Sequence, residues 1–308
     1  MVKRSMFLIG TVLMSLGAIV ALLVLLAPPR TTVYAAPPPG CTQIGLDITN
    51  DTTWNAACYE IMTTTVTIAP GATLTITPPV TGTHIYFQTG TRLQVEGRLQ
   101  ALGTATRPIT FTASNPTEAS PCGGQGRWLG IIFGANSIRN RIQYALIEYA
   151  CTGIAPSGST QIGDGDWILS NTLRYNGGIG EFNGAIGGDI DYSQIQYNTI
   201  YSSSQGIVLN EGSHNFITDN TIRDIARTGV HLKRGGTGGG NYNNINRNVI
   251  YNCGLEGIRT ADSNYNAITY NTIHNCGTAG VYAEDSSGNS VNNNDIYDCG
   301  AAGIYLDN

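Results

Sequence analysis

The 308-residue chain has few charged residues and many glycines. Charged side chains make up 12% of it, glycines number 39, and the formal net charge is −5. This composition is typical of a turn-rich β protein with a modest charged surface. A protein that binds nucleic acid needs a basic stripe to neutralise phosphates, so the acidic balance argues against nucleic acid as a partner.

The chain begins with a targeting pattern. Lys3 and Arg4 precede an apolar run from Met6 to Ala27, and Val33-Tyr34-Ala35 has the small-x-small form of a cleavage site. We therefore expect residues 1–35 to be a signal peptide that sends the chain out of the cytoplasm, as a secreted or cell-surface protein. The apolar run is also long enough to span a bilayer, so an uncleaved membrane anchor is the alternative. We expect no other membrane contact.

Short apolar runs with alternate spacing follow this segment. Apolar residues two apart in short runs indicate strands with one face inside. We expect residues 36–62 to cap the first coil, because an exposed parallel edge would otherwise template aggregation. Irregular strands then follow, separated by turn residues such as Pro70-Gly71; they are Val66–Ile68, Leu74–Ile76, Ile85–Phe87, Leu93–Val95, Ile109–Phe111 and Ile131–Phe133.

The second half of the chain repeats itself. Equivalent segments begin at Gly206, Gly229, Gly257, Gly280 and Gly303, with spacings of 23, 28, 23 and 23 residues. Each repeat holds three short runs of strand periodicity, which predicts a solenoid of about ten coils of roughly 23 residues over residues 63–308. Parallel stacking of such coils pairs every strand above and below. The last repeat does not finish, which predicts a chain that is incomplete at this end or a partner that covers it.

Six asparagines occupy one register of these repeats, each two residues before a Leu or Ile. An amide both donates and accepts, so identical asparagines about 4.8 Å apart can chain hydrogen bonds along the stack. Turn preference alone is the alternative explanation for asparagine at this position. We expect a structural ladder of Asn171, Asn198, Asn220, Asn248, Asn271 and Asn294.

The seven cysteines fall into two groups. Cys253, Cys276 and Cys299 share a register with Ile225, which predicts small buried hydrophobes; no His or carboxylate shares the column, and this disfavours a metal site. An exported chain forms disulfides, and four thiols allow three pairings. The most local pairings join Cys41 with Cys58 and Cys122 with Cys151.

We expect no bound cofactor. The segment Gly163-Asp164-Gly165-Asp166 has oxygen ligands for Ca²⁺, but no later Glu completes a calcium loop. The segment therefore predicts a turn.

Several segments of the first half resemble one known class of protein. They are Val66–Leu74, Leu93–Thr104, Pro108–Thr112 and Trp128–Ile131. Together they resemble the opening of bacterial extracellular right-handed parallel β-helix proteins, and the later Gly-Ile and Asn-x-Ile repeats are similar to pectin-lyase-like and NosD-type repeats. The resemblance implies an all-β fold, a right-handed parallel β-helix. It leaves the activity open, because the class includes lyases, hydrolases, epimerases and proteins with no known reaction.

Candidate functional residues come from outward positions of the first strand in each repeat. The third residue of each repeat gives Val208, His231, Arg259, Tyr282 and Tyr305, and the fifth includes Lys233 and Glu284. Sugar rings could stack on Tyr282 and Tyr305 while Arg259 holds carboxylates, so Tyr282, Tyr305, Glu284 and Arg259 are the ligand-binding candidates. The alternative is that these are ordinary exposed strand residues. A second outward column, Arg223, Tyr251, His274 and Tyr297, is of similar composition.

These residues favour a surface protein that interacts with carbohydrate, or a scaffold, without catalysis. The alternative is a polysaccharide lyase or related hydrolase or epimerase that uses His231 as base and Lys233 and Arg259 as cations. A hydrolase would need two carboxylates across a groove, for which Asp262 with Asp285 is available by register. The expected partner is a polysaccharide or cell-surface glycan.

Overall fold

The computed structural model describes residues 40–116, 122, 125–156, 165–177, 183–234 and 240–307. The predicted signal peptide or anchor, residues 1–35, lies outside the described residues. Strands dominate the described part, which contains no helix. Accordingly, none of these residues belongs to a helix that is long and apolar enough to cross a membrane.

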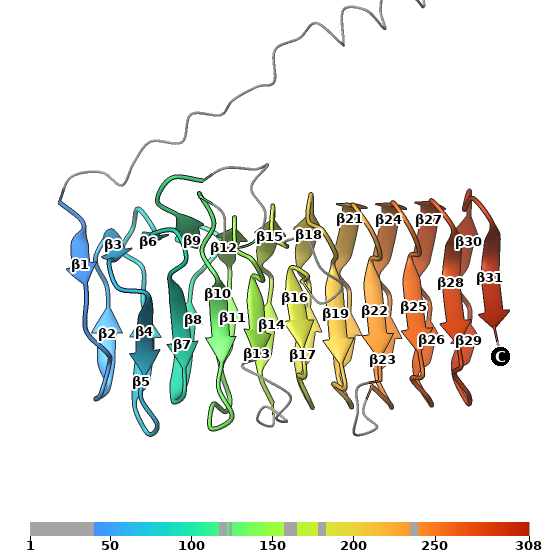
Figure 1. The fold of residues 1–308 in the computed structure, drawn as a ribbon, viewed down its shortest axis with the longest axis horizontal. Coiled ribbons are helices and arrows are strands. Elements are labelled where there is room, and N and C mark those ends of the chain that lie inside the picture. Colours follow the sequence, from blue (N-terminus) through green and yellow to red (C-terminus); the bar gives the residue numbers. More distant parts are fainter. Residues whose placement is uncertain are drawn as a thin grey trace, which may run out of the picture. The chain divides into compact units, whose positions relative to one another are not determined.

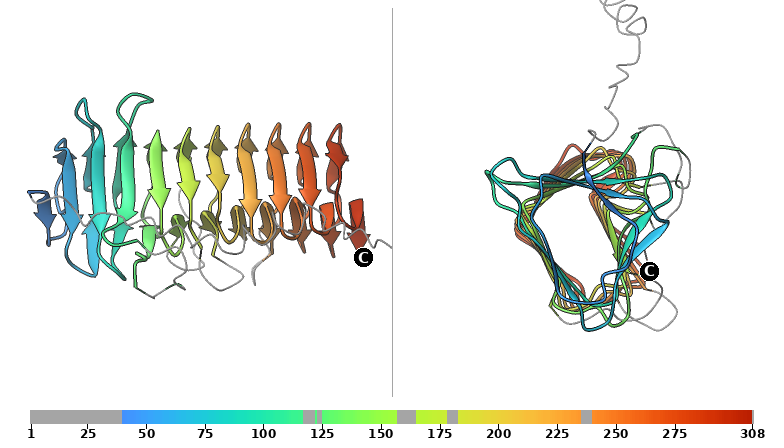
Figure 2. Two further views of the ribbon diagram at one scale, coloured as in Figure 1. Left: turned by 90° about the horizontal axis from the view of Figure 1, so that it is seen from above. Right: turned by 90° about the vertical axis from the view of Figure 1, so that its left-hand side faces the viewer.

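The described strands form three parallel sheets that run the length of a solenoid (Figure 1). Viewed down the long axis, the coils superimpose into a closed tube with one sheet on each side (Figure 2). The sheets hold 11, 10 and 10 strands, and every pairing is parallel, with the chain passing through each sheet once per coil. The fold predicted from the repeats, a β-helix of about ten coils, is confirmed.

We name the sheets A, B and C. Sheet A consists of β1 (Thr42–Ile44), β3 (Cys58–Ile61), β6 (Thr83–Phe87), β9 (Ile109–Ala113), β12 (Ala145–Glu148), β15 (Thr172–Arg174), β18 (Thr199–Tyr201), β21 (Thr221–Ile225), β24 (Val249–Cys253), β27 (Thr272–Cys276) and β30 (Asp295–Tyr297).

Sheet B carries the first strand of each repeat. It consists of β4 (Thr65–Ile68), β7 (Arg92–Val95), β10 (Gly130–Phe133), β13 (Ile154–Pro156), β16 (Ile186–Gly188), β19 (Ile207–Asn210), β22 (Val230–Lys233), β25 (Ile258–Ala261), β28 (Ala279–Glu284) and β31 (Ala302–Asp307).

Sheet C completes each coil. It consists of β2 (Thr52–Trp54), β5 (Thr73–Ile76), β8 (Arg98–Leu102), β11 (Arg141–Gln143), β14 (Trp167–Leu169), β17 (Gln194–Gln196), β20 (Phe216–Thr218), β23 (Asn244–Asn246), β26 (Ala267–Thr269) and β29 (Ser290–Asn292). In the segment expected to be a cap, residues 36–62, the described residues from 40 onward contribute β1, β2 and β3, which pair with sheets A and C at this end of the solenoid.

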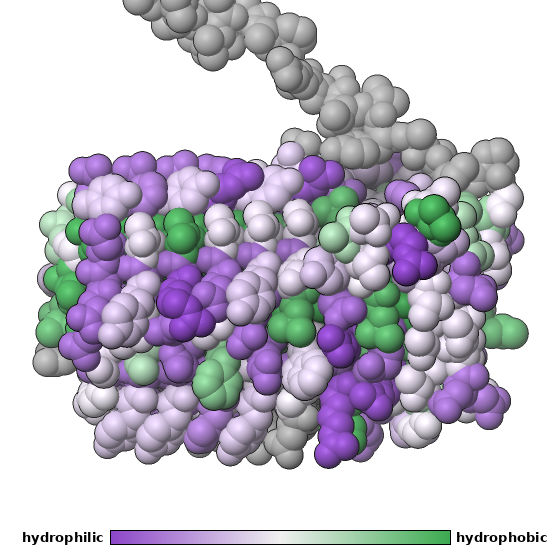
Figure 3. All heavy atoms as spheres, turned by 180° about the vertical axis from the view of Figure 1, so that it is seen from behind, coloured by the Kyte–Doolittle hydropathy of each residue, from purple (hydrophilic) through white to green (hydrophobic). Residues whose placement is uncertain are grey.

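The core is a set of apolar columns inside the tube. Ile195, Ile217, Ile245 and Ile268 pair in register through sheet C and are at most 1% exposed. Burial of each such side chain contributes about 1.5–3 kcal/mol. The same register orders the outer surface, where side chains of like hydropathy recur in rows along the long axis (Figure 3). Residues far apart in sequence therefore become neighbours.

Asparagines hydrogen-bond from coil to coil at the corner between sheets C and A. The Oδ1 atom of Asn220 accepts from the backbone N–H and the side-chain amide of Asn198, at 2.9 and 3.0 Å, while its Nδ2 donates to the Ile195 carbonyl at 2.8 Å. Asn171, Asn198, Asn220, Asn248, Asn271 and Asn294 continue this pattern. The residue before each has a positive φ, as in Tyr197 at 58° and Arg247 at 53°. These bonds hold the left-handed turn that ends each sheet C strand.

A second column of this kind lies at the other end of the sheet C strands. Its members are Asn140, Asp166, Ser193, Asn215, Asn243, Asn266 and Asn289, joined by side-chain-to-backbone hydrogen bonds from coil to coil. Asp166, which the sequence placed in a turn with oxygen ligands for a cation, is therefore a buried member of this column.

The cysteines occupy the positions that the register gives them. Cys41 is joined to Cys58 and Cys122 to Cys151, with Cα atoms 4.9 and 5.0 Å apart. The thiols of Cys253 and Cys276 are buried and that of Cys299 is half-buried, all in one column of sheet A or the turn after it. The disulfides thus constrain the irregular half, while the thiol column belongs to the regular half.

Candidate functional site

The register of sheet B brings the predicted site residues together. His231 pairs with Arg259, Arg259 with Tyr282, and Tyr282 with Tyr305, on successive strands from β22 to β31. Glu284 lies on β28, two strands from Lys233 in the same register. Because neighbouring strands are about 4.8 Å apart, these side chains form one continuous surface.

A hollow of about 210 Å³ lies on this surface. His231, Lys233, Arg259 and Glu284, four of the residues singled out from the sequence, line it. The full lining comprises Gln205, Arg227, Thr228, His231, Lys233, Arg234, Arg259, Ala261, Asp262, Glu284 and Asp285. Its ionisable groups are four cations and three carboxylates around one imidazole. Tyr282 and Tyr305 are outside this lining.

His231 is the most enclosed of these groups. It is 8% exposed, and its Nε2 atom is buried without a hydrogen-bond partner in the described part of the chain. Burial, followed by the charges of Arg259, Lys233 and Arg227, lowers the pKa of His231 to about 4. The imidazole is therefore neutral at neutral pH, and it is a weak base.

Arg259 is held on two sides. Its guanidinium forms an ion pair with Glu284, and its Cζ lies 5.3 Å from the ring centroid of Tyr282. Its Nε is buried without a partner among the described residues. The guanidinium is therefore oriented, and it presents its charge beside the hollow.

The two tyrosines of this column pack on each other. The ring centroids of Tyr282 and Tyr305 are 5.3 Å apart with a 39° tilt, and the Tyr282 hydroxyl donates to Asp307 at 3.0 Å. Tyr282 thus lies between Arg259 and Tyr305 in the stack. A ligand reaches its edge and hydroxyl more readily than its ring faces.

The second outward column, on sheet A, is a closed stack. Tyr251, His274 and Tyr297 lie with ring centroids 5.0 and 4.8 Å apart and interplanar angles of 4°. Arg223 lies over the ring of Tyr201 at 4.3 Å in the same register. Because these rings cover one another, the column is best explained as packing between coils.

Sequence reasoning missed Arg227, Gln205 and Thr228 as neighbours of His231. They belong to the turns that precede β19 and β22, beside the strands and not on them. Their position one or two residues before Gly206 or Gly229 is the signal that could have found them.

This architecture defines a right-handed parallel β-helix protein, and comparison with known families agrees. Residues 183–308 match the right-handed β-helix region, and residues 81–245, more than half of the chain, match the family described as periplasmic copper-binding protein (NosD). The chain belongs to the NosD family. None of the curated proteins matches it significantly.

Solved structures with the same fold include enzymes of alginate. The A-modules of the Azotobacter vinelandii mannuronan C-5 epimerases AlgE6 and AlgE4 give TM-scores of 0.61 and 0.62 at 15% identity, covering 84% of this chain and 71% and 72% of theirs. A mutant of the periplasmic alginate epimerase AlgG gives 0.53 at 13% identity, covering 82% of this chain and 60% of that one. At such identities the likeness concerns the fold alone.

The described residues do not fit a copper centre. No group of three or more His, Cys, Asp or Glu side chains among them could hold a metal ion. The column of Cys253, Cys276 and Cys299 supplies soft donors, but a hydrogen bond with Cys253, together with burial, raises the pKa of the Cys276 thiol. Copper(I) prefers thiolates, and this environment favours the protonated thiol.

Proposed function

We propose that this protein binds an acidic polysaccharide outside the cytoplasm, through the hollow around His231 on sheet B. The observation that carries the proposal is the convergence of Arg227, Lys233, Arg234 and Arg259 on that hollow. A polyuronate carries a carboxylate on every sugar, so one chain can engage several of these cations. A guanidinium binds a carboxylate with two parallel hydrogen bonds, which suits Arg259 to the central contact.

The location outside the cytoplasm rests on three features. The first 35 residues have the form of an export signal. Two disulfides are typical of proteins that fold in an oxidising compartment. The family that the chain matches is described as periplasmic.

Mannuronan is the first polysaccharide to test, because the fold is shared with mannuronan C-5 epimerases. Binding of an oligomannuronate of defined length is measured by isothermal titration calorimetry at low and high salt. We expect Arg259→Ala to weaken binding at least about tenfold, since a hydrogen bond to a charged group contributes about 1.5–3 kcal/mol. High salt should weaken wild-type binding through screening.

Two variants control this experiment. Arg247→Ala removes an exposed arginine that pairs with Asp219 at a corner of sheet C, and it should leave binding unchanged. Glu284→Gln removes the carboxylate that competes for Arg259, and it should tighten binding. Wild-type affinity in Arg259→Ala would refute the proposal.

Catalysis on the same sugar is the second candidate. A lyase or epimerase removes the proton beside a uronate carboxylate, and the neutral imidazole of His231 lies among cations that could stabilise the resulting charge. Its low pKa and its enclosed Nε2 make it a poor base, which favours binding without turnover. Ultraviolet absorbance of an unsaturated uronate, or exchange of the C5 proton with solvent deuterium, that is lost in His231→Gln would establish catalysis instead.

A further inference from the structure

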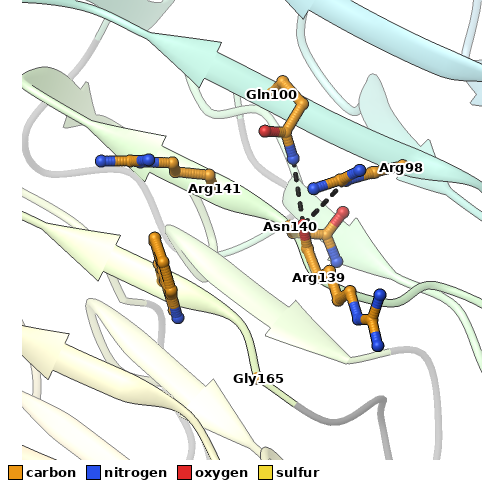
Figure 4. Close-up of a pocket in the computed structure, with 7 residues that line it drawn as sticks. Arg98, Gln100, Arg139, Asn140, Arg141 and Gly165 are labelled. Atoms are coloured by element: carbon orange, nitrogen blue, oxygen red, sulfur yellow. Dashed lines mark hydrogen bonds between the residues drawn. The ribbon is translucent and has the colours of Figure 1, made fainter.

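A second hollow, on sheet C of an earlier coil, is lined by three arginines and a tryptophan (Figure 4). Its volume is about 370 Å³, and its side chains come from β8, β11, β14 and the turn before β11. They are Arg98, Gln100, Arg139, Asn140, Arg141 and Trp167. Among the described residues of this lining there is no carboxylate, in contrast to the mixed charges around His231.

Hydrogen bonds orient the side chains of Arg98 and Arg141 without neutralising them. Arg98 and Gln100 both donate to the carbonyl oxygen of Arg139, each at 3.0 Å (Figure 4). Arg141 donates through Nε to Gln143 at 2.8 Å, and its Cζ lies 4.9 Å from the ring centroid of Trp167. Within the described part of the chain, Arg98, Arg139 and Arg141 form no ion pair. Three arginines therefore line the hollow, and the guanidinium of Arg141 lies against the indole of Trp167.

The hollow lies where a stack of aromatic rings is interrupted. Tyr192, His214, Tyr242 and Tyr265 each precede a member of the second hydrogen-bonded column, and their ring centroids are 4.7, 5.2 and 5.3 Å apart. In the same register, Gly165 follows Arg139 and precedes Tyr192. A Cβ atom built at Gly165 meets nothing within 4 Å. We call this open position, between the coils of Arg139 and Tyr192, the Gly165 slot.

We propose that the Gly165 slot and its arginines form a binding site for one ring of an anionic sugar that carries a carboxylate or sulfate group. The ring would occupy the level of the stack at which Gly165 contributes no side chain, beside the indole of Trp167. Its anionic group would bind the terminal nitrogens of Arg98, Arg139 and Arg141, which are suited to planar bidentate contacts with oxyanions. Sugars present C–H faces to indole rings and hydroxyls to water, so a half-exposed tryptophan suits them.

Two observations favour a sugar over a nucleic acid. The chain has a net charge of −5, and in the described part of the chain the three arginines line one hollow and are not part of a basic stripe. This site is independent of the hollow around His231, because it lies on another sheet and shares no residue with it. An experiment can therefore refute binding at one of the two sites without bearing on the other.

Tryptophan fluorescence gives a direct test, because the three tryptophans differ in exposure. Trp54 and Trp128 are 4% and 0% exposed, whereas Trp167 is 40% exposed. Titration with oligomannuronate or a sulfated oligosaccharide should therefore give a saturable change in emission from Trp167. Neutral dextran oligosaccharide should give none. The arm that binds more tightly identifies carboxylate or sulfate as the recognised group.

Matched variants separate this site from the first. Gly165→Tyr should abolish the fluorescence response by completing the ring stack, and it leaves the charge of the site unchanged. Arg139→Asn removes the guanidinium but introduces a side chain that tolerates the φ of 53° at this position. It should raise the dissociation constant for the anionic sugar at least about tenfold. Arg259→Ala, on sheet B, should leave the response at its wild-type strength.

Thermal unfolding shows whether Gly165→Tyr is folded. Gly165 has a φ of 86°, and tyrosine occupies the equivalent position at Tyr192, Tyr242 and Tyr265 with φ of 48°, 57° and 55°, so we expect the variant to fold after a small backbone adjustment, with some loss of stability. If it does not, Arg139→Asn and Arg98→Gln decide the question through affinity. The proposal is overturned if these variants respond like wild type, if neutral dextran gives the same response, or if single-stranded DNA binds more tightly than either anionic sugar.

Discussion

Asp166 accepts two hydrogen bonds from Asn140, one from its backbone N–H at 2.7 Å and one from its side-chain amide at 3.1 Å. Both come to Oδ1, while Oδ2 is buried without a partner among the described residues. At other positions of this column an asparagine has an NH₂ group where Asp166 has Oδ2. The Nδ2 of Asn215, for example, donates to the Ile190 carbonyl at 2.6 Å. Asp166 therefore presents an acceptor where its equivalents present a donor.

The first prediction concerns Asp166→Asn. Burial raises the pKa of Asp166 to about 7, against the hydrogen bonds from Asn140, which lower it. The folded protein thus holds a proton between pH 4 and 7 that the unfolded chain releases, so this carboxyl reduces stability as pH rises through that range. Asp166→Asn should be more stable than wild type at pH 8 by about 2–4 kcal/mol, and by much less at pH 4.5.

Urea unfolding at the two pH values measures this difference. Asp189, whose pKa burial raises to about 6, is unchanged in both proteins, so its contribution cancels. A variant less stable than wild type at pH 8 would show that the ionised carboxylate is needed at this position.

The second prediction has the opposite sign and concerns His231. Its pKa of about 4 lies below the value of 6.5 that is usual for histidine. As pH falls below 6.5 the unfolded chain takes up a proton that the folded protein does not accept until about pH 4. Wild type should therefore lose up to about 3 kcal/mol of stability between pH 7 and 4 relative to His231→Gln.

The measured quantity is the difference in unfolding free energy between wild type and His231→Gln at each pH. Asp166 and Asp189, whose pKa values are raised, make the folded state more stable as pH falls, but they do so in both proteins, so their contribution cancels. A difference that stays constant from pH 7 to pH 4 would mean that His231 is protonated as easily in the folded state as in the unfolded one.

The third prediction tests the asparagine column between sheets C and A. Asn220→Ala would leave the N–H groups of Asn198 and the carbonyl of Ile195 without their buried partner. Each buried group left unpaired costs about 1–3 kcal/mol, so we expect a loss of about 3–5 kcal/mol in the free energy of unfolding. The matched control is Asn292→Ala, at an exposed strand position, which should change stability by less than about 0.5 kcal/mol.

The regular half of the fold was predictable because one register recurs. The spacing from Gly206 to Gly280 places the sheet B strands β19, β22, β25 and β28, and so it places His231 beside Arg259. Alternation along the strand also predicted that His231 points outward. It does line the surface hollow, but neighbouring residues leave only 8% of it exposed. Neighbours such as Gln205 and Thr228 lie beside it in the turns, and a pattern read along one strand does not include them.

The Gly165 slot shows a different limit. Arg98, Arg139 and Arg141 lie in the irregular half, where no repeated letters align one coil with the next. Their convergence depends on the pairing of Arg141 with Gln100 and Trp167. Gly165 stands out only once the stack of Tyr192, His214, Tyr242 and Tyr265 is known. A glycine looks like any other turn residue in the sequence until its position is aligned with these rings.

The last prediction concerns the three free thiols. Cys253 and Cys276 are buried, and Cys299 is half-buried. The hydrogen bond with Cys253, then burial, raises the pKa of Cys276, and burial also raises the pKa of Cys299. Because thiolate and access together control alkylation, Cys299 should react with iodoacetamide at least about tenfold faster than Cys276 in the folded protein. Peptide mapping by mass spectrometry measures both rates. In concentrated urea the rates should become equal, and equal rates in the folded protein would show that the thiol column opens to solvent along its length.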